Sequence, residues 1–485
     1  MITRIKINGF KSLLNTELYL GPFTCIAGEN AAGKSNLFDA IVFLSHLADK
    51  TILEAAKSIR CESQKHLNIR DIFFKHGDKS YSTMEFEVDL LVPKSAEDDL
   101  GQVAKASVSA LKYRLILQYN DVDSNSAQLP IQILEESLSP MTRDDAKKSI
   151  GFKHSKEWRE SVLFGRKSST VISTQDGKIK LHQDTQGKRG GRAAEFIAQK
   201  MPRTLLSTVT AESPTAFMVR QEMRNWKLLQ FEPSYLRNPN SFHDIHSATV
   251  DEHGGNIPAT LTRLAQTDEG EVFCRITNQL KDLVKDVASI DVDKDEKREL
   301  LTLMVTFKNG LRLPAQSLSD GTLRFIGLGV VQEDNNNPLI CMEEPENGIN
   351  PKKIIAIVDL LQRLAFDANI EIDEEFNPLR QIIINTHSPR LVEMIPEDSL
   401  YMARNSEVFD KNIDSIVNYT EFVILPDTYK TTVCNSTIRI VPLGDMKSYL
   451  DGYIYDDLQM KQSFKNVRSN IKKQEAALNN EPTLF

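Results

Sequence analysis

Gly28-Glu29-Asn30-Ala31-Ala32-Gly33-Lys34-Ser35 matches the phosphate-loop pattern G-x-x-x-x-G-K-[ST] at every fixed position. The apolar run over 23–27 predicts a short buried strand before the loop, and apolar residues at helical spacing over 36–47 predict a helix after it. Strand, glycine loop and helix therefore follow one another in the order that a phosphate site requires. A chance glycine loop is the alternative, and the flanking elements disfavour it.

The residues of this loop have complementary roles in holding phosphate. Glycines let the backbone wrap closely around the anion, and the free N–H groups and dipole of the following helix attract it. Lys34 adds a full positive charge, and the hydroxyl of Ser35 is placed to ligate the magnesium that accompanies the phosphates. We expect the nucleotide-binding residues here to be Gly28, Asn30, Gly33, Lys34, Ser35 and Asn36.

Two further apolar runs end in polar residues that suit phosphate chemistry. Residues 338–342 lead to Glu343 and Glu344, and residues 381–386 lead to His387. An α/β sheet presents ligand chemistry at the carboxyl ends of its strands. We expect Glu343 to hold magnesium, and Glu344 and His387 to be catalytic, as the base for the attacking water and as the sensor of the γ-phosphate. Taken alone, a capping acid and a core histidine would be the simpler interpretations.

Leu318-Ser319-Asp320-Gly321-Thr322 lies upstream of the acidic run and places a serine and a glycine at the start of a predicted helix. Such a helix end is a second phosphate-binding end. The chain cannot easily bring this end to its own Lys34. We therefore expect Ser319 and Gly321 to bind nucleotide at a place separate from the loop.

These stretches together resemble the motifs of ABC-type ATPase heads. In the family's order they are the Walker A motif at 28–35, the signature at 318–322, the Walker B motif at 339–344, the D-loop at 347–350 and the histidine switch at His387. S-D-G-T-L-R-F, E-E-P-E-N-G, N-T-H-S-P and the opening I-K-I-N-G-F-K-S-L look like the RecF/SMC-related branch. That branch contains OLD-family ATPases and the ATPase subunits of the anti-phage systems Septu (PtuA) and PARIS (AriA). The resemblance covers about Met1 to Leu90 and Lys285 to Arg404.

The resemblance implies an α/β fold, an ABC-type ATPase head in which a mixed sheet with the phosphate loop is joined by an antiparallel β lobe. Inserted helical and β segments and a small C-terminal extension complete it. ATP and Mg²⁺ are the implied cofactors, and ATP hydrolysis is the implied reaction. The implied homo-oligomer is an ATP-sandwich dimer or a higher assembly, in which Lys34, Ser35, Glu343, Glu344 and His387 of one copy face Ser319 and Gly321 of another.

Four features depart from the family's pattern. Glu343 stands where aspartate is usual, which implies looser magnesium geometry and slower hydrolysis. Asp320 stands where glycine is usual in ABC-type heads, as in the RecF/SMC-related branch. No long heptad arm interrupts the chain, which excludes a true SMC protein. A nucleotide-sensing glutamine is expected near 68–74, but Gln64 is the only candidate there and its context is poor.

The chain divides into five expected parts. They are the two halves of the ATPase head at 1–90 and 285–404, an antiparallel β lobe at 91–192, a helical segment at 193–284 and a partner-docking extension at 405–485. Alternation predicts strands in the lobe, clearest at 84–90, 113–119, 131–134, 161–164 and 178–182, with exposed loops or short helices at 92–107 and 139–157. Helical patterning follows at 193–201 and 213–225.

Three other features have two interpretations each. The basic run at 187–192 is either a nucleic-acid contact or, as we favour, a solvated loop. The histidines at 243, 246 and 253 suggest a metal site, but no cysteine or second histidine pair completes a zinc pattern. The basic tail at 452–479 either docks a partner or is an amphipathic closing helix, and it is too short for the C-terminal nuclease domain of an OLD enzyme.

Composition places the chain among ordinary globular proteins. Its 485 residues exceed one typical core, and its five cysteines form no C-x-x-C pair, as in reduced cytoplasmic proteins. The N-terminus lacks the apolar core of a secretory signal, and no apolar run has membrane-spanning length. A net charge of -8 argues against non-specific coating of nucleic acid and leaves room for a local basic groove. We therefore expect a cytoplasmic protein with no membrane partner.

Three functions fit the sequence. The first is the ATPase and sensor subunit of a two-component anti-phage system that switches an HNH or Toprim nuclease encoded by a neighbouring gene. The second is a RecF-like repair ATPase that binds DNA, and the third is a nuclease hidden in the middle lobe or the tail. The first predicts a stoichiometric protein complex, the second salt-dependent duplex binding, and the third metal-dependent cleavage by the chain alone.

Overall fold

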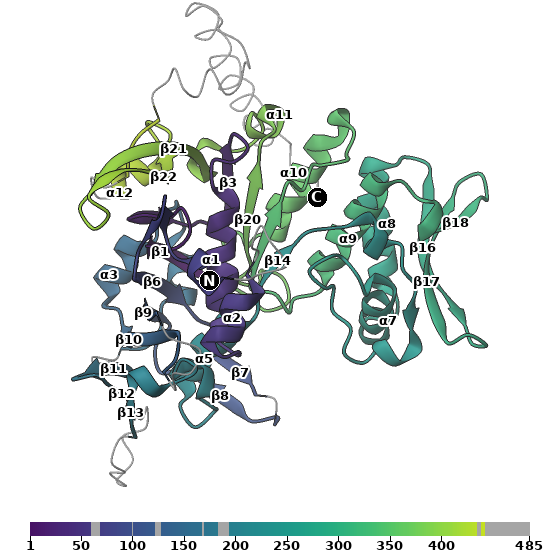
Figure 1. Ribbon diagram of the computed structural model, residues 1–485. Helices are drawn as coiled ribbons and strands as arrows, with labels where there is room; N and C mark the ends of the chain where they lie inside the picture. Colours follow the sequence, from purple (N-terminus) through teal and green to yellow (C-terminus); the bar gives the residue numbers. More distant parts are fainter. Residues whose placement is uncertain are drawn as a thin grey trace, which may run out of the picture. The chain divides into compact units, whose positions relative to one another are not determined.

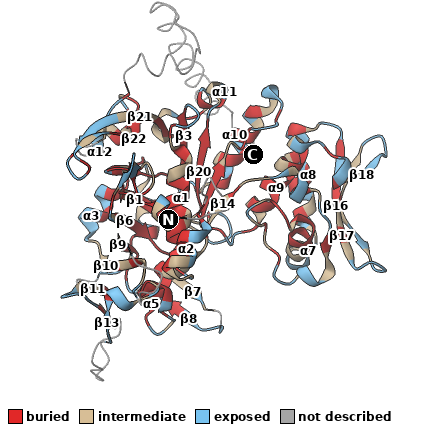
Figure 2. Cartoon of the chain, in the orientation of Figure 1, coloured by how far each residue is buried: buried red, intermediate tan, exposed pale blue. Residues whose placement is uncertain are grey.

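The phosphate loop follows a strand near the centre of a six-stranded sheet. From β14 to β21 neighbouring strands run parallel, and β22 joins the edge antiparallel. β3 and β20 are buried throughout (Figure 2), as expected for parallel strands that are covered on both faces. In spatial order the strands are β14 (Trp226–Leu229), β19 (Leu339–Glu343), β20 (Gln381–Thr386), β3 (Phe23–Gly28), β21 (Leu400–Asp410) and β22 (Ser415–Ile424).

The computed structural model describes residues 1–59, 68–98, 100–121, 128–166, 169–182, 194–433 and 438–441. Residues 1–440 form one compact unit, drawn in Figure 1. The basic run at 187–192, Gln64 and the tail at 452–479 lie outside the described residues. No helix among the described residues combines the length and the apolar character needed to cross a bilayer.

A second sheet of eight strands is antiparallel at every pairing. Its strands, in spatial order, are β13 (Glu195–Ile197), β12 (Lys178–Leu181), β11 (Ile172–Gln175), β10 (Ile131–Pro140), β9 (Ala110–Tyr119), β6 (Thr83–Leu91), β1 (Ile2–Asn8) and β2 (Thr16–Tyr19). The predicted fold class, a mixed sheet with the phosphate loop plus an antiparallel β lobe, is confirmed. The first 90 residues contribute strands to both sheets.

The helix after the phosphate loop is held in the main apolar core. α1 (Lys34–Leu47) contacts β3, β14, α2 (Ile52–Ser58) and α5 (Pro214–Arg224). The Phe43 ring lies 5.7 Å from that of Phe10 and 5.8 Å from that of Phe86, so the helix also packs on residues of the β-lobe side. Because both sheets contact it, α1 fixes the position of the phosphate loop in the core.

A separate group of helices packs on a small antiparallel sheet. α9 (Asp320–Glu333), which begins in the signature stretch, contacts α6 (Pro233–Leu236), α7 (Ile257–Thr267) and α8 (Glu271–Leu283). Figure 1 shows α7, α8 and α9 together beside β16 and β17. The small sheet comprises β15 (Asn240–Ser241), β16 (Val287–Asp295), β17 (Leu300–Phe307) and β18 (Arg312–Pro314). α10 (Ile354–Leu364) contacts both α9 and β20. The predicted helix at 213–225 corresponds to α5.

The remaining elements are short. They are α3 (Arg143–Ser149), α4 (Lys156–Val162), α11 (Pro389–Val392), α12 (Tyr429–Val433), β4 (Lys75–His76), β5 (Lys79–Ser80), β7 (Ser95–Glu97) and β8 (Val103–Lys105). The 3₁₀ helices are η1 (Ile69–Ile72), η2 (Ala198–Lys200), η3 (Leu206–Thr208), η4 (Phe242–Asp244), η5 (Ala315–Ser317), η6 (Pro351–Lys353) and η7 (Glu397–Ser399).

Three predicted segments are wrong. The strand expected at 161–164 overlaps the last residues of α4. Ser155 caps the start of that helix by accepting from Trp158 N at 2.9 Å. Trp158 and Val162 share the buried face of α4, four residues apart, so a short apolar run has helical rather than strand periodicity. The segment 193–201, expected as a helix, instead forms β13 and η2, because the pairing of β13 with β12 overrides the local helix propensity. The segment 92–107, expected as loops or short helices, forms the β7–β8 hairpin.

Glu136 on β10 is a buried acid whose titration affects stability. Its carboxylate accepts from Leu205 N at 2.7 Å, Leu206 N at 2.9 Å and the Tyr113 hydroxyl at 3.2 Å. Burial raises the pKa of Glu136 from 4.5 to about 7. Between these values the folded chain binds more protons than the unfolded chain, so the stability contributed by this group is lost as the pH rises through the window.

Glu136→Gln removes this titration, and the unfolding free energies of wild type and variant are therefore expected to diverge with pH. Relative to the variant, wild type loses about 3 kcal/mol between pH 4.5 and pH 8, at about 1.4 kcal/mol per unit of pKa shift. Urea unfolding of both proteins at several pH values measures the difference. A constant difference across that range would contradict the prediction.

Candidate functional site

Two glycines of the phosphate loop are required by close packing. A side-chain carbon at Gly28 would lie 2.4 Å from the Ala403 carbonyl oxygen, and one at Gly33 would lie 1.8 Å from Thr420 Oγ1. Gly33 also has a φ of 83°, a left-handed conformation that favours glycine. The neighbouring residues belong to β21 and β22, so this hairpin lies directly against the loop.

Lys34 lies folded over its own loop. Its Nζ donates to the carbonyl oxygens of Gly28 and Glu29, both at 2.8 Å. Burial lowers the pKa of Lys34, while the negative charges of Glu344 and Glu343 act in the opposite direction. The charge of Lys34 therefore interacts electrostatically with both carboxylates, although Lys34 and the two glutamates are about 300 residues apart in the chain.

The loop is also held by residues that the sequence did not single out. Asn36 Nδ2 donates to Ser12 Oγ at 2.6 Å, and Ser12 Oγ lies 2.5 Å from Thr420 Oγ1. Lys11 forms an ion pair of 2.7 Å with Asp39 on α1. Of the other predicted loop residues, Asn30 is exposed and Ser35 is half-buried. The side chain of Asn36 is thus engaged with the segment after β1 as well as lying at the start of α1.

Glu344 begins a sharp turn at the carboxyl end of β19. Its φ is 45°, and its N–H lies 3.1 Å from both the backbone and the side-chain oxygen of Asn385 on β20. His387 Nδ1 lies 2.7 Å from Glu344 Oε1, and both side chains are partly exposed. Strained backbone of this kind is often found at functional sites. The structure thus brings the two expected catalytic residues into direct contact.

Glu343 is held by amide groups from both neighbouring strands. Gln230 Nε2 donates to Glu343 Oε2, and Asn385 Nδ2 donates to Glu343 Oε1 at 3.5 Å. Gln230 follows β14, and the parallel register pairs Leu229 with Met342, so the glutamine reaches the end of β19 beside Glu343. Sequence reasoning missed Gln230. The signal that could have found it is a glutamine at the carboxyl end of a short strand, here β14, which is the same strand-end position that selected Glu343 and His387.

Gln230→Ala is expected to raise the magnesium concentration needed for half-maximal ATP hydrolysis by about tenfold or more. The reason is that Gln230 orients the Glu343 carboxylate, and removing a group that orients a metal ligand typically costs 10- to 100-fold in metal affinity or activity. Magnesium titration of ATPase activity measures the change. Gln332→Ala, which removes a glutamine from the far end of α9, is the control and should titrate as wild type does. Equal curves for Gln230→Ala and wild type would contradict the prediction.

Glu346 is a third carboxylate near Lys34 that the sequence did not assign. It is 8% exposed, and Thr386 donates its hydroxyl to Glu346 Oε1. Burial raises the pKa of Glu346. Since the Thr386 hydroxyl also accepts from Ser388 N at 2.9 Å, the Glu346 carboxylate fixes the turn that carries His387.

The signature residues lie beside the D-loop. Ser319 caps α9 by accepting from Thr322 N at 3.3 Å, and a side-chain carbon at Gly321 would lie 3.4 Å from the Gly348 carbonyl oxygen. Within the described residues, no hydrogen bond or ion pair joins Ser319 or Gly321 to the phosphate loop. The structure thus brings together the loop, acidic and histidine residues, and leaves the signature at a separate, exposed helix end.

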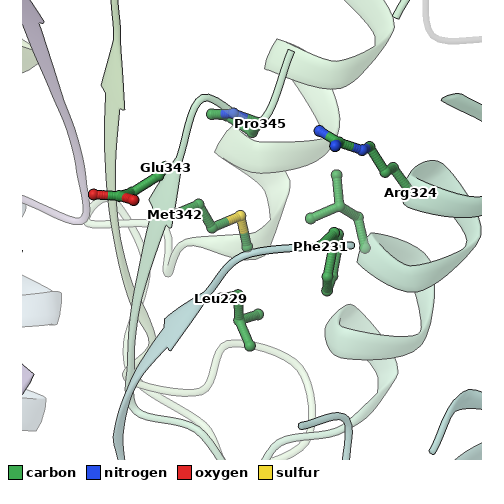
Figure 3. A pocket seen from close by; sticks show the side chains of 7 residues that line it. Leu229, Phe231, Arg324, Met342, Glu343 and Pro345 are labelled. Atoms are coloured by element: carbon green, nitrogen blue, oxygen red, sulfur yellow. The ribbon is translucent and has the colours of Figure 1, made fainter. Parts of the chain in front are cut away.

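A small pocket separates the signature helix from the strand ends. Figure 3 shows its lining, which comprises Leu229, Phe231, Arg324, Leu328, Met342, Glu343 and Pro345. On α9, a side-chain carbon at Gly327 would lie 3.3 Å from the Phe231 ring. The helix therefore packs closely on the residue that follows Gln230, so the signature helix and the Glu343 end of β19 share one contact region.

The side chains suit magnesium bound together with phosphate. A hydroxyl at Ser35 and a carboxylate at Glu343 are hard oxygen donors, and magnesium in nucleotide sites uses one or two carboxylates plus phosphate oxygens and water. The described part of the chain contains no group of three or more His, Cys, Asp or Glu side chains that could hold a metal ion, and the histidines at 243, 246 and 253 form none. Magnesium is therefore expected here only together with nucleotide.

Two family models match the chain. The one described as "AAA ATPase domain" matches residues 1–204, and the one described as "AAA domain, putative AbiEii toxin, Type IV TA system" matches residues 230–393. The first match contains the phosphate loop, and the second contains Gln230, Glu343, Glu344 and His387. Together they support an ATPase of the AAA class whose site is assembled from two separate stretches.

No curated protein is significantly similar to the chain in sequence. Among solved structures, an SMC head bound to the C-terminal winged-helix domain of ScpA is 13% identical, with a TM-score of 0.44, 87% of this chain covered and 98% of that chain. The SMC head domain from Thermotoga maritima is 11% identical, with a TM-score of 0.36 and the same coverages. A Pyrococcus furiosus SMC head with an extended coiled coil, bound to the C-terminal domain of ScpA, is 11% identical, with a TM-score of 0.41 and coverages of 87% and 96%. These likenesses are distant, and we draw no conclusion about function from them.

Proposed function

We propose that the chain is the ATP-hydrolysing sensor subunit of a two-component anti-phage complex, which controls a nuclease partner through ATP-dependent pairing of two copies. The observation that carries the ATPase part is the convergence of Lys34, Gln230, Glu343, Glu344 and His387 at one edge of the central sheet. A lysine, a metal-binding carboxylate and a carboxylate–histidine pair are the groups that ATP hydrolysis requires.

Each of these groups has a step in hydrolysis. When ATP binds, the Lys34 ammonium group leaves the loop carbonyl oxygens that it now contacts and donates to phosphate oxygens instead. Its positive charge then lies beside the β- and γ-phosphates. Glu344 accepts the proton of the attacking water, and His387, 2.7 Å from its carboxylate, orients that carboxylate and the water. Bound magnesium would offset the negative charge of the phosphates and orient them.

The signature end supports pairing of two copies. Ser319 and Asp320 are exposed at the start of a 14-residue helix, where free N–H groups and the helix dipole attract an anion. In the described structure this end lies beside the D-loop rather than on the phosphate loop. A second copy in the reciprocal orientation would place each signature on the γ-phosphate held by the other copy. ATP then joins the copies, and hydrolysis releases them.

The nuclease partner is the part of the proposal that rests on analogy. One of the matching family descriptions names a putative toxin of a type IV toxin–antitoxin system, which is an arrangement of two gene products. The motif resemblance to anti-phage ATPase subunits points the same way. We propose an HNH or Toprim nuclease as the partner, and the nucleotide state of the paired heads as the signal that controls it.

The test is plasmid cleavage by this chain co-purified with the product of its neighbouring gene, with ATP titrated. The proposal expects a stoichiometric complex whose cleavage changes with ATP and is absent when either protein is omitted. Lys34→Ala and Glu344→Gln in the same complex fix the unbound and the ATP-bound states, and should give opposite outputs. A chain that hydrolyses ATP but binds no neighbour product would overturn the sensor role and leave the ATPase assignment standing.

A further inference from the structure

Asp320 places a negative charge at the exposed end of the signature helix. It is the first residue of α9, directly between Ser319 and Gly321, and its side chain is 48% exposed. A carboxylate there is attracted by the helix dipole and therefore competes with any phosphate for the same N–H groups. Two negative charges a few ångströms apart also repel each other. The signature can bind phosphate only if this charge is offset.

Arg237 provides the offsetting charge. Its Nη2 donates to Asp320 Oδ1 and also to the Leu318 carbonyl oxygen at 3.1 Å. A guanidinium group stays charged at every physiological pH and has several donors, so one arginine can hold a carbonyl oxygen and a carboxylate together. With 28% of its side chain exposed, Arg237 lies at the surface beside Ser319 rather than in the core.

The position of Arg237 is fixed by packing against the signature helix. It follows α6, whose Leu236 is 1% exposed and, like Phe231, lies 3.3 Å from the place of a side-chain carbon at Gly327 on α9. The same short connection starts at Gln230, which contacts Glu343. Residues 230–237 therefore join the Glu343 end of the sheet to the signature, and Arg237 is the residue at which this connection meets Asp320.

We propose that Arg237 is a positioning residue that neutralises Asp320, and so allows Ser319 and Gly321 to bind the phosphate of ATP held by a second copy. This inference rests on the proposed pairing of two copies. In this role Arg237 acts through its charge. The alternative is a purely structural role, in which Arg237 only holds the segment before α9 by donating to the Leu318 carbonyl oxygen. The two roles predict different results when the charge of Asp320 is removed as well.

The test is a double-mutant cycle on ATP-driven self-association. Arg237→Ala, Asp320→Asn and the double variant are made in the Glu344→Gln background, and their masses are measured in MgATP as protein concentration is varied. Arg237→Ala is expected to weaken association about tenfold or more, because an unpaired carboxylate then faces the phosphate. Asp320→Asn alone should associate at least as tightly as its parent, and the double variant should recover to within about threefold of it.

Two controls separate this role from damage to the fold. Arg275→Ala removes a partly exposed arginine with ion pairs to Asp268 and Glu333 in the same group of helices, and should leave association unchanged. Binding of a fluorescent ATP analogue by the single chain should be equal in all variants, since the signature serves the other copy's nucleotide.

Each remaining outcome is decisive. If the Glu344→Gln parent dimerises but the double variant associates as weakly as Arg237→Ala, Arg237 has only the structural role. The inference is then overturned, while the proposed pairing of two copies stands. If Arg237→Ala associates as its parent does, the inference is also overturned. If the parent stays a single chain in MgATP, the proposed pairing fails, and the inference fails with it.

Discussion

Glu344→Gln is expected to lower ATP hydrolysis at least about a hundredfold while MgATP binding is retained. General-base catalysis typically contributes 10²- to 10⁴-fold, and a glutamine of the same shape cannot accept the proton. The amide keeps a hydrogen-bonding group beside His387. Residue 344 donates to Asn385 through its backbone N–H, which the substitution leaves unchanged. The turn should therefore survive. Steady-state phosphate release and equilibrium nucleotide binding, measured on the same preparation, check both parts of the prediction.

The same variant is expected to accumulate as an ATP-bound dimer, because the step that separates the copies is blocked. Native mass with MgATP and without nucleotide measures this. Glu393→Gln, an exposed acid in the turn after α11, is the matched control and should hydrolyse ATP at the wild-type rate. Unchanged hydrolysis by Glu344→Gln would remove Glu344 from the catalytic role. Lost hydrolysis with an unchanged native mass would instead count against the dimer.

The parts of the site that the sequence predicted are those that a short local pattern marks. The phosphate loop has fixed spacing, so the identities of Gly28, Gly33 and Lys34 were enough to place them. Glu343 and His387 were selected because an apolar run precedes each, and the carboxyl ends of parallel strands meet at one edge of a sheet. In the fold, β19 and β20 pair in parallel and Glu343 lies opposite Asn385. This register is the physical reason that the ends of the two strands, and with them Glu343 and His387, lie at the same edge.

The residues that the sequence missed are brought in by strand register and by packing between distant segments. Gln230 reaches Glu343 because β14 pairs with β19, and Thr420 reaches Gly33 because the β21–β22 hairpin lies against the loop. Gln230 is marked only by its place at the end of a short strand, and Thr420 lies inside β22 with no local pattern that marks it. The strand predicted at 161–164 is wrong for a different reason. Four residues are too few to distinguish helical from strand periodicity, and the helix that covers 161–162 begins at its capping residue, Ser155, six residues earlier.

Lys34→Ala is expected to weaken ATP binding by about a hundredfold or more and to abolish measurable hydrolysis. A charge-assisted contact to phosphate in a partly buried site contributes about 3 kcal/mol, and 1.4 kcal/mol corresponds to a factor of ten in affinity. Lys34 is buried before ATP binds, so little further desolvation of its ammonium group offsets that contribution on binding. Calorimetric titration with MgATP measures the affinity.

Removing Lys34 also removes the donor for those two carbonyl oxygens, so loss of binding has to be separated from loss of the loop. Lys34→Arg keeps the charge and donors and should retain the wild-type melting temperature, yet bind ATP weakly because a planar guanidinium group does not fit a cradle built for a point charge. Lys57→Ala, which changes an exposed lysine at the end of α2, should match wild type in both affinity and melting temperature. Retained ATP affinity in a folded Lys34→Ala variant would contradict the assignment of the loop as the nucleotide site, because Lys34 supplies the positive charge of that loop.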